Sequence, residues 1–164
     1  MKQTYRVLAG LVALGVLVQA AAIAFGWFSS LHDVDNGLVI DKNYDGNAGH
    51  AIHGIDGQFI IPLIGLILLI VSFFAARSVP GARKWAGIVF GLIVLQVVLA
   101  FLSFGIPAFG ALHGINALFI LGTAVRAVSL TSGPLAAAGA PAAGVPSQRP
   151  APQAGEASRP APPA

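Results

Sequence analysis

The chain alternates long apolar runs with short polar connections, and this pattern predicts four membrane-spanning helices. The runs cover about residues 6–29, 50–77, 84–105 and 111–130. Each has the roughly 20 residues that a helix needs to cross the hydrocarbon core of a bilayer, and no run shows the alternation of a half-buried β-strand. We therefore expect an all-α integral membrane protein in which residues 1–131 form a four-transmembrane-helix bundle.

Composition agrees with a chain that is embedded in a membrane. Of its 164 residues, 56% are hydrophobic and only 9% are charged, which is too apolar for a small soluble domain. Residues 132–164 are dominated by Pro, Ala, Gly, Ser and Gln, and this composition predicts a disordered cytoplasmic tail. The absence of cysteine excludes disulfide bonds, thiolate metal sites and heme attached through thioethers.

Basic residues are distributed unequally between the two sides of the predicted membrane. Of the nine Lys and Arg residues, only Lys42 falls in the connection after the first run. The others are Lys2, Arg6, Arg77, Arg83, Lys84, Arg126, Arg149 and Arg159. The positive-inside rule then places both termini in the cytoplasm, and we expect a multi-pass protein of a bacterial inner (plasma) membrane. The basic residues are scattered and do not form the patch that binds nucleic acid.

A cleavable signal peptide is the alternative interpretation of the first apolar run, because the run follows a basic start and contains small residues. The run is longer than the apolar part of a usual signal peptide, so we favour a retained helix.

A segment of ten residues recurs within the chain. Residues 51–60, AIHGIDGQFI, and residues 111–120, ALHGINALFI, are identical at six of ten positions. Gln19 and Gln96 occupy matching places in the apolar runs that precede the two segments, at an offset of 77. Each half is thus predicted to be a helical hairpin, and two duplicated hairpins in the same orientation imply a pseudo-twofold axis along the membrane normal.

The repeat predicts a heme site at a pair of histidines. His53 and His113 fall at the same depth, near the outer ends of the second and fourth helices. A histidine inside a membrane span is costly unless it is paired or liganded, and it usually faces the interior of the bundle. Two neutral imidazoles on facing helices suit the axial positions of a heme iron. We therefore predict that these two residues bind one heme b.

Residues beside the histidines extend the predicted site. Gly54 and Gly114 would make room for the edges of a porphyrin. Asp56 and Asn116 follow their histidines by three residues and share the same helix face. Asp56 would orient an imidazole or relay a proton, although a carboxylate that is simply solvated by the outer connection fits the sequence equally well.

Two other interpretations remain open. In the first, the protein is a cofactor-free structural or interaction protein, and the duplicated histidines are interfacial packing and hydrogen-bonding residues. In either case, we expect Gln19 and Gln96 to join helices by hydrogen bonds. In the second, His50 and His32 form an outer-face zinc or copper site with His53. No nucleophile with a base and no phosphate-binding glycine loop stands out, so an enzyme is the less favoured reading.

These motifs resemble those of known families. With a histidine near the outer end of its second and fourth helices, the chain is similar to one four-helix half of heme A synthase, in which such histidines hold heme. It resembles more closely an uncharacterised bacterial family of small four-helix membrane proteins, through Leu95-Gln96 and Leu112-His113-Gly-Ile-Asn116. The likeness covers about residues 5–130 as architecture. The predicted heme would serve in electron transfer, heme handling or oxidase assembly. Because one heme cannot carry electrons across the full thickness of the membrane, we also expect a redox or assembly partner protein.

One departure limits what the resemblance implies about chemistry. Heme A synthase has an acidic residue one turn before the histidine of its second helix, where this chain has His50. Hydroxylation of a heme methyl group is therefore not expected.

Overall fold

The fold is known from a computed structural model that describes residues 1–132, so the predicted disordered tail lies almost wholly outside the described residues. The elements are α1 (Lys2–Asp35), α2 (Ala48–Ile55), the π-helical turn η1 (Asp56–Ile60), α3 (Ile61–Ala75), α4 (Ala82–Gly105) and α5 (Ala108–Ser129). Because α2, η1 and α3 follow one another without a break, the described chain has four helices long and apolar enough to cross a membrane. The prediction of four long apolar helices is therefore confirmed, and residues 1–132 contain no strand.

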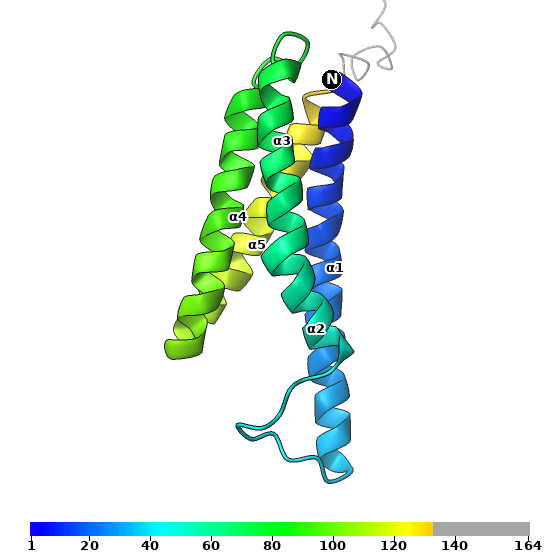
Figure 1. Ribbon diagram of the computed structural model, residues 1–164, viewed down its shortest axis with the longest axis vertical. Helices are drawn as coiled ribbons and strands as arrows, with labels where there is room; N and C mark the ends of the chain where they lie inside the picture. Colours follow the sequence, from blue (N-terminus) through cyan, green and yellow to red (C-terminus); the bar gives the residue numbers. More distant parts are fainter. Residues whose placement is uncertain (133–164) are drawn as a thin grey trace, which may run out of the picture. The chain divides into compact units, whose positions relative to one another are not determined.

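The four spans form a ring of neighbouring helices (Figure 1). The first span, α1, packs against the second span, formed by α2, η1 and α3, and against α5. On the other side, α4 packs against α3 and α5. Spans one and four are therefore neighbours, and the second span lies diagonally opposite α5.

The two ends of the bundle differ in chemistry. At one end, the Tyr5 hydroxyl donates to the carbonyl of Ala82 over 3.2 Å, and the Arg126 guanidinium lies 5.5 Å from the centre of the Trp85 ring. We call this the basic end, since it also holds the other Lys and Arg residues of the described chain except Lys42. The opposite end carries the connection of residues 36–47, and we call it the loop end.

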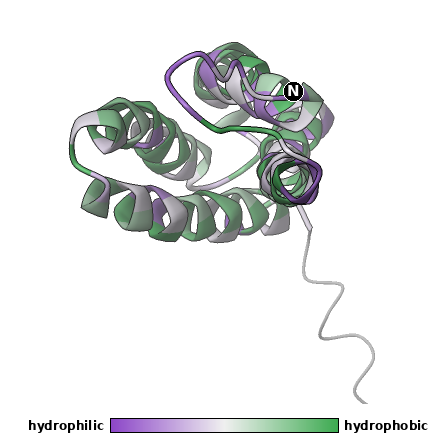
Figure 2. Cartoon of the chain, turned by 90° about the horizontal axis from the view of Figure 1, so that it is seen from below, coloured by the Kyte–Doolittle hydropathy of each residue, from purple (hydrophilic) through white to green (hydrophobic). Residues whose placement is uncertain are grey.

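Burial is uneven along the bundle and across each helix. Near the basic end, Tyr5, Ala9 and Val12 of α1 and Ala124 and Ala127 of α5 are fully buried. Large apolar side chains are nevertheless exposed along every span, and Figure 2 shows hydrophobic residues on outward as well as inward faces. A helix that is hydrophobic on all sides is typical of a protein whose outer surface contacts lipid.

The first helix is longer than its apolar run predicts. It ends at Asp35 rather than near residue 29, and the chain turns away from the helix at Gly37, which adopts a φ of 98°. A helix of 34 residues is about 50 Å long, whereas the hydrocarbon core is about 30 Å thick. The helix is therefore longer than a single crossing of a bilayer requires.

The second span is irregular where it approaches the histidine segment. Pro62 has no amide hydrogen to donate, and its ring crowds the carbonyl four residues earlier. The turn just before it, Asp56–Ile60, is a π-helix, in which the Ile61 amide donates to the carbonyl of Asp56. Such a turn adds one residue to the helix and commonly occurs at functional sites. This π-turn follows α2 directly and begins three residues after His53.

Candidate functional site

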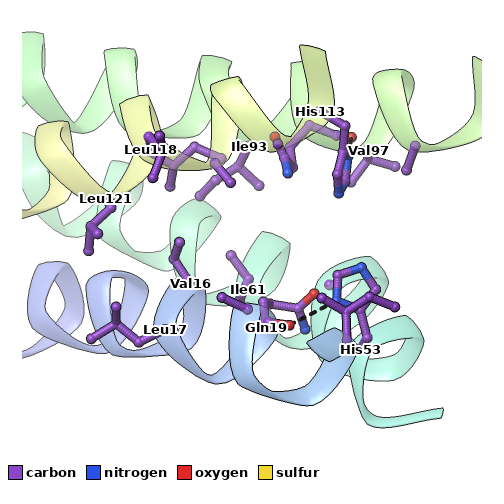
Figure 3. Close-up of a pocket in the computed structure, with 18 residues that line it drawn as sticks. Val16, Leu17, Gln19, His53, Ile61, Ile93, Val97, His113, Leu118 and Leu121 are labelled. Atoms are coloured by element: carbon purple, nitrogen blue, oxygen red, sulfur yellow. Dashed lines mark hydrogen bonds between the residues drawn. The ribbon is translucent and has the colours of Figure 1, made fainter. Parts of the chain in front are cut away.

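The structure brings the two recurrent histidines together. His53 lies in α2 and His113 in α5, on diagonally opposite spans, and both side chains are half-buried. The ring centres are 6.2 Å apart and the ring planes are inclined by 62°. Figure 3 shows the two rings pointing toward one another from opposite walls of a pocket.

Each imidazole is held by the backbone of the helix that precedes it in the chain. The Nδ1–H of His53 donates to the carbonyl oxygen of Gln19 over 3.2 Å, and that of His113 donates to the carbonyl oxygen of Gln96 over 3.1 Å. A carbonyl oxygen can only accept, so the hydrogen of each neutral ring lies on Nδ1. Nε2 of both rings then carries a lone pair, which is the form that binds a metal ion.

The glutamine side chains form a second set of contacts one turn away. The Gln19 amide donates to Asp56 Oδ2 over 2.9 Å. In the other half, Asn116 Nδ2 donates to Gln96 Oε1 over 2.7 Å and to the Leu92 carbonyl over 2.9 Å. The hydrogen bonds that the sequence predicts for the two glutamines thus join helices. Asp56 and Asn116 bond to the glutamines and do not line the pocket.

The pocket between the histidines is a largely apolar cavity of about 300 Å³. Its polar side chains are His53, His113, Gln19 and Gln96, and the rest of its wall is aliphatic side chains and glycine. No Asp, Glu, Lys or Arg lines it. Cavities that bind cofactors have this character, with a mostly hydrophobic wall and a few polar groups that fix the orientation of the ligand.

The glycines near the histidines have different roles. Gly114 lines the cavity, and a Cβ added there would meet no atom within 4 Å, so this glycine borders open space. Gly57 also lines the cavity, and a Cβ there would lie 2.9 Å from Gln19 Oε1. Gly54, which the sequence placed beside the ligand, does not line the cavity. The missing side chain of Gly57 therefore lets the Gln19 amide approach the second span closely.

His50 and His32, the residues of the alternative metal site, lie elsewhere. His50 belongs to the cap of α2, where its Nδ1 accepts from the Asn47 amide over 3.3 Å. Its ring packs edge-on against Trp27, with centres 5.1 Å apart. His32 is exposed in the last turn of α1. Across residues 1–132, no three His, Asp or Glu side chains are placed to hold a metal ion together.

Sequence reasoning did not find how the rings are oriented. The recurrence of Gln19 and Gln96 was the only sequence signal near these contacts, and it suggested a role for the glutamine side chains. The groups that fix the imidazoles are the backbone carbonyls of the same residues, and a carbonyl carries no side-chain signature.

Comparison with known proteins adds no relative to this description. No protein-family model, curated protein or solved structure matches the chain.

Proposed function

We propose that this protein binds one heme b between its second and fourth spans, with Nε2 of His53 and of His113 as the two axial ligands. The observation that carries the proposal is the facing pair of imidazoles with ring centres 6.2 Å apart. Two imidazoles that bind one metal ion from opposite sides, each through a bond of about 2 Å, have ring centres about 6 Å apart. The measured separation therefore fits a shared ion.

Three features of the site support heme over a bare metal ion. The two imidazoles are the only metal-ligating side chains on the cavity wall, and a zinc ion requires about four ligands. The aliphatic wall suits the apolar faces of a porphyrin. The cavity of about 300 Å³ is at the lower limit for a cofactor site, and its opening lets a flat ligand extend beyond it. A bound heme would supply reversible one-electron chemistry.

The chain's own residues define the electrostatic environment of such a site. The carbonyls of Gln19 and Gln96 accept from Nδ1 of the two imidazoles, and this leaves Nε2 of each ring free to bind a ligand. No charged side chain touches the cavity, so the ligands are held in a medium of low polarity. The hydrogen bonds to the Gln19 and Gln96 carbonyls also fix the orientation of each imidazole ring before any ligand binds.

The biological role that this site supports is electron transfer, heme handling or oxidase assembly in a bacterial inner membrane, with both termini cytoplasmic. The matched bonds His53–Gln19 and His113–Gln96 support the proposed duplication of the hairpin, and the likeness to one half of heme A synthase agrees with it. A single heme near one face cannot carry electrons through the whole membrane. A partner protein is therefore part of the proposal.

The test is an absorption spectrum of the full-length protein purified in detergent and incubated with ferric heme b. We expect a Soret band and, after reduction, a sharp α band. His53→Ala and His113→Ala each remove one axial ligand and should abolish the sharp α band. His50→Ala is the matched control, because His50 lies three residues from His53 on the same helix but outside the cavity.

A cofactor-free structural protein is the second candidate. It is favoured by one observation: the histidine and glutamine bonds join neighbouring helices without any ligand. If the wild type gives no heme spectrum while its fold remains intact by circular dichroism, the heme proposal is wrong and this candidate replaces it. Elemental analysis of the wild type and of His50→Ala tests the outer zinc or copper site in the same preparation.

A further inference from the structure

We infer that the cavity takes up and releases its ligand sideways, through the seam between α1 and α5, in direct exchange with the hydrocarbon phase of the bilayer. This inference rests on the proposed heme site and adds the source of the ligand. It assigns the occupant to flat, amphipathic molecules that are dissolved in the membrane.

The wall of the cavity is incomplete at this seam. Leu17 of α1 and Leu118 of α5 both line the cavity, yet 54% and 68% of their surfaces are exposed. Ala20 and Gly114 also line the cavity and are exposed, and an added Cβ at Gly114 would meet nothing within 4 Å. Residues that face both the cavity and the outside mark an opening.

The opening is confined to the half of the seam that contains the histidines. Toward the basic end, the same two helices meet through fully buried residues, among them Val12 of α1 and Ala124 of α5. The two hairpins are thus tightly joined at one end and parted beside the site, as Figure 1 shows for the helices themselves.

The rim of the opening has the chemistry of a lipid-facing portal. Leu17, Leu118 and Ala20 are aliphatic, and they lie within helices apolar enough to span a membrane. The charged connection of residues 36–47 contributes no residue to the cavity wall. A polar solute that passes this rim would give up its hydrogen bonds to water without finding new partners, whereas an apolar ring has no such hydrogen bonds to give up.

The experiment measures the rate of heme loading into the full-length protein in phosphatidylcholine vesicles. Ferric heme b, which dissolves in the bilayer, is added, and growth of the Soret band is followed in time. Leu17→Trp places a bulky indole ring across the opening, and we expect loading to slow severalfold. Leu17→Ala widens the opening and should speed loading.

Leu14→Trp is the matched control, because Leu14 lies on the same helix with 55% of its surface exposed but does not line the cavity. Dilution with protein-free lipid at constant total heme should slow loading of the wild type if the ligand comes from the bilayer. Equal rates for Leu17→Trp, Leu17→Ala and Leu14→Trp, with normal final spectra, would overturn the portal and leave the heme site standing. Absence of a Soret band in the wild type would instead overturn the heme site, and the portal with it.

Discussion

The two halves of the site differ at one residue in a way that reverses the orientation of the glutamines. Asp56 can only accept when ionised, so the Gln19 amide turns its NH₂ group toward it. Asn116 donates, so Gln96 presents its oxygen instead. The imidazole–carbonyl bonds are the same in both halves, so this difference does not change how the two rings are held.

Removal of the Asn116 side chain should destabilise the bundle more than removal of other hydrogen-bonding groups of α5. Asn116 is 4% exposed and supplies the donor for both the Leu92 carbonyl and Gln96 Oε1. Hydrogen bonds between membrane helices contribute up to about 1.7 kcal/mol, so Asn116→Ala should lower the free energy of unfolding by roughly 1–2 kcal/mol. Titration with sodium dodecyl sulfate, followed by circular dichroism, measures it.

Thr123→Ala is the control for this prediction. The Thr123 hydroxyl bonds only to carbonyls of its own helix, which keep their backbone amide partners, and its loss should cost little. If the two variants unfold at the same detergent fraction, the bonds of Asn116 do not contribute to the stability of the bundle.

At the scale of helices, the sequence predicts the features that depend on the length of an apolar run. It does not predict features that depend on local interactions. The four spans were predictable because a bilayer requires long apolar runs, and the loop ends of the third and fourth spans, Gly105 and Ala108, fall within three residues of the expected 105 and 111. The end of α1 at Asp35 was not predictable, because the polar residues that follow the apolar run can be either helical or part of a loop. Pro62 indicates that the second span is irregular, but it does not predict that the turn before it is a π-helix.

The same distinction applies to the histidine pair. The recurrence in the sequence placed His53 and His113 at equal depth, and the diagonal packing of their helices brings the rings within 6.2 Å. Sequence could not tell Gly54 from Gly57, because which glycine meets the neighbouring helix depends on the rotation of α2 and η1 about their axis.

Two glycines of α2 should respond in opposite ways to the same substitution. A Cβ at Gly49 would lie 2.5 Å from the Ala22 carbonyl oxygen and 2.5 Å from the Gly26 nitrogen. These are backbone atoms of α1 and cannot move aside, so Gly49→Ala should destabilise the bundle by about 1–3 kcal/mol. Gly54→Ala meets nothing within 4 Å and should be neutral or slightly stabilising, because alanine favours the helix.

Thermal denaturation of the two variants in the same detergent compares them directly. Equal melting temperatures would show that α1 and α2 do not pack through Gly49. A melting temperature lowered only in Gly54→Ala would place α2 in a different rotation about its axis, and with it His53.

At the scale of the whole bundle, the distribution of charge predicts which end faces the cytoplasm. Six of the seven Lys and Arg residues in the described part of the chain lie at or near the basic end, and only Lys42 lies in the connection at the loop end. Positive residues near the ends of spans are retained on the cytoplasmic side. The histidine site would then lie near the outer face.

Because the chain has no cysteine, a single introduced cysteine reports the side on which it lies. Asp45→Cys labels the connection at the loop end, and Ser78→Cys labels the turn between α3 and α4; both residues are exposed. In intact spheroplasts, a membrane-impermeant maleimide should modify Asp45→Cys, and it should modify Ser78→Cys only after the membrane is opened with detergent. The reverse pattern would invert the bundle and move the histidine site to the cytoplasmic face, whereas modification of both cysteines before opening would contradict a bundle that spans the membrane.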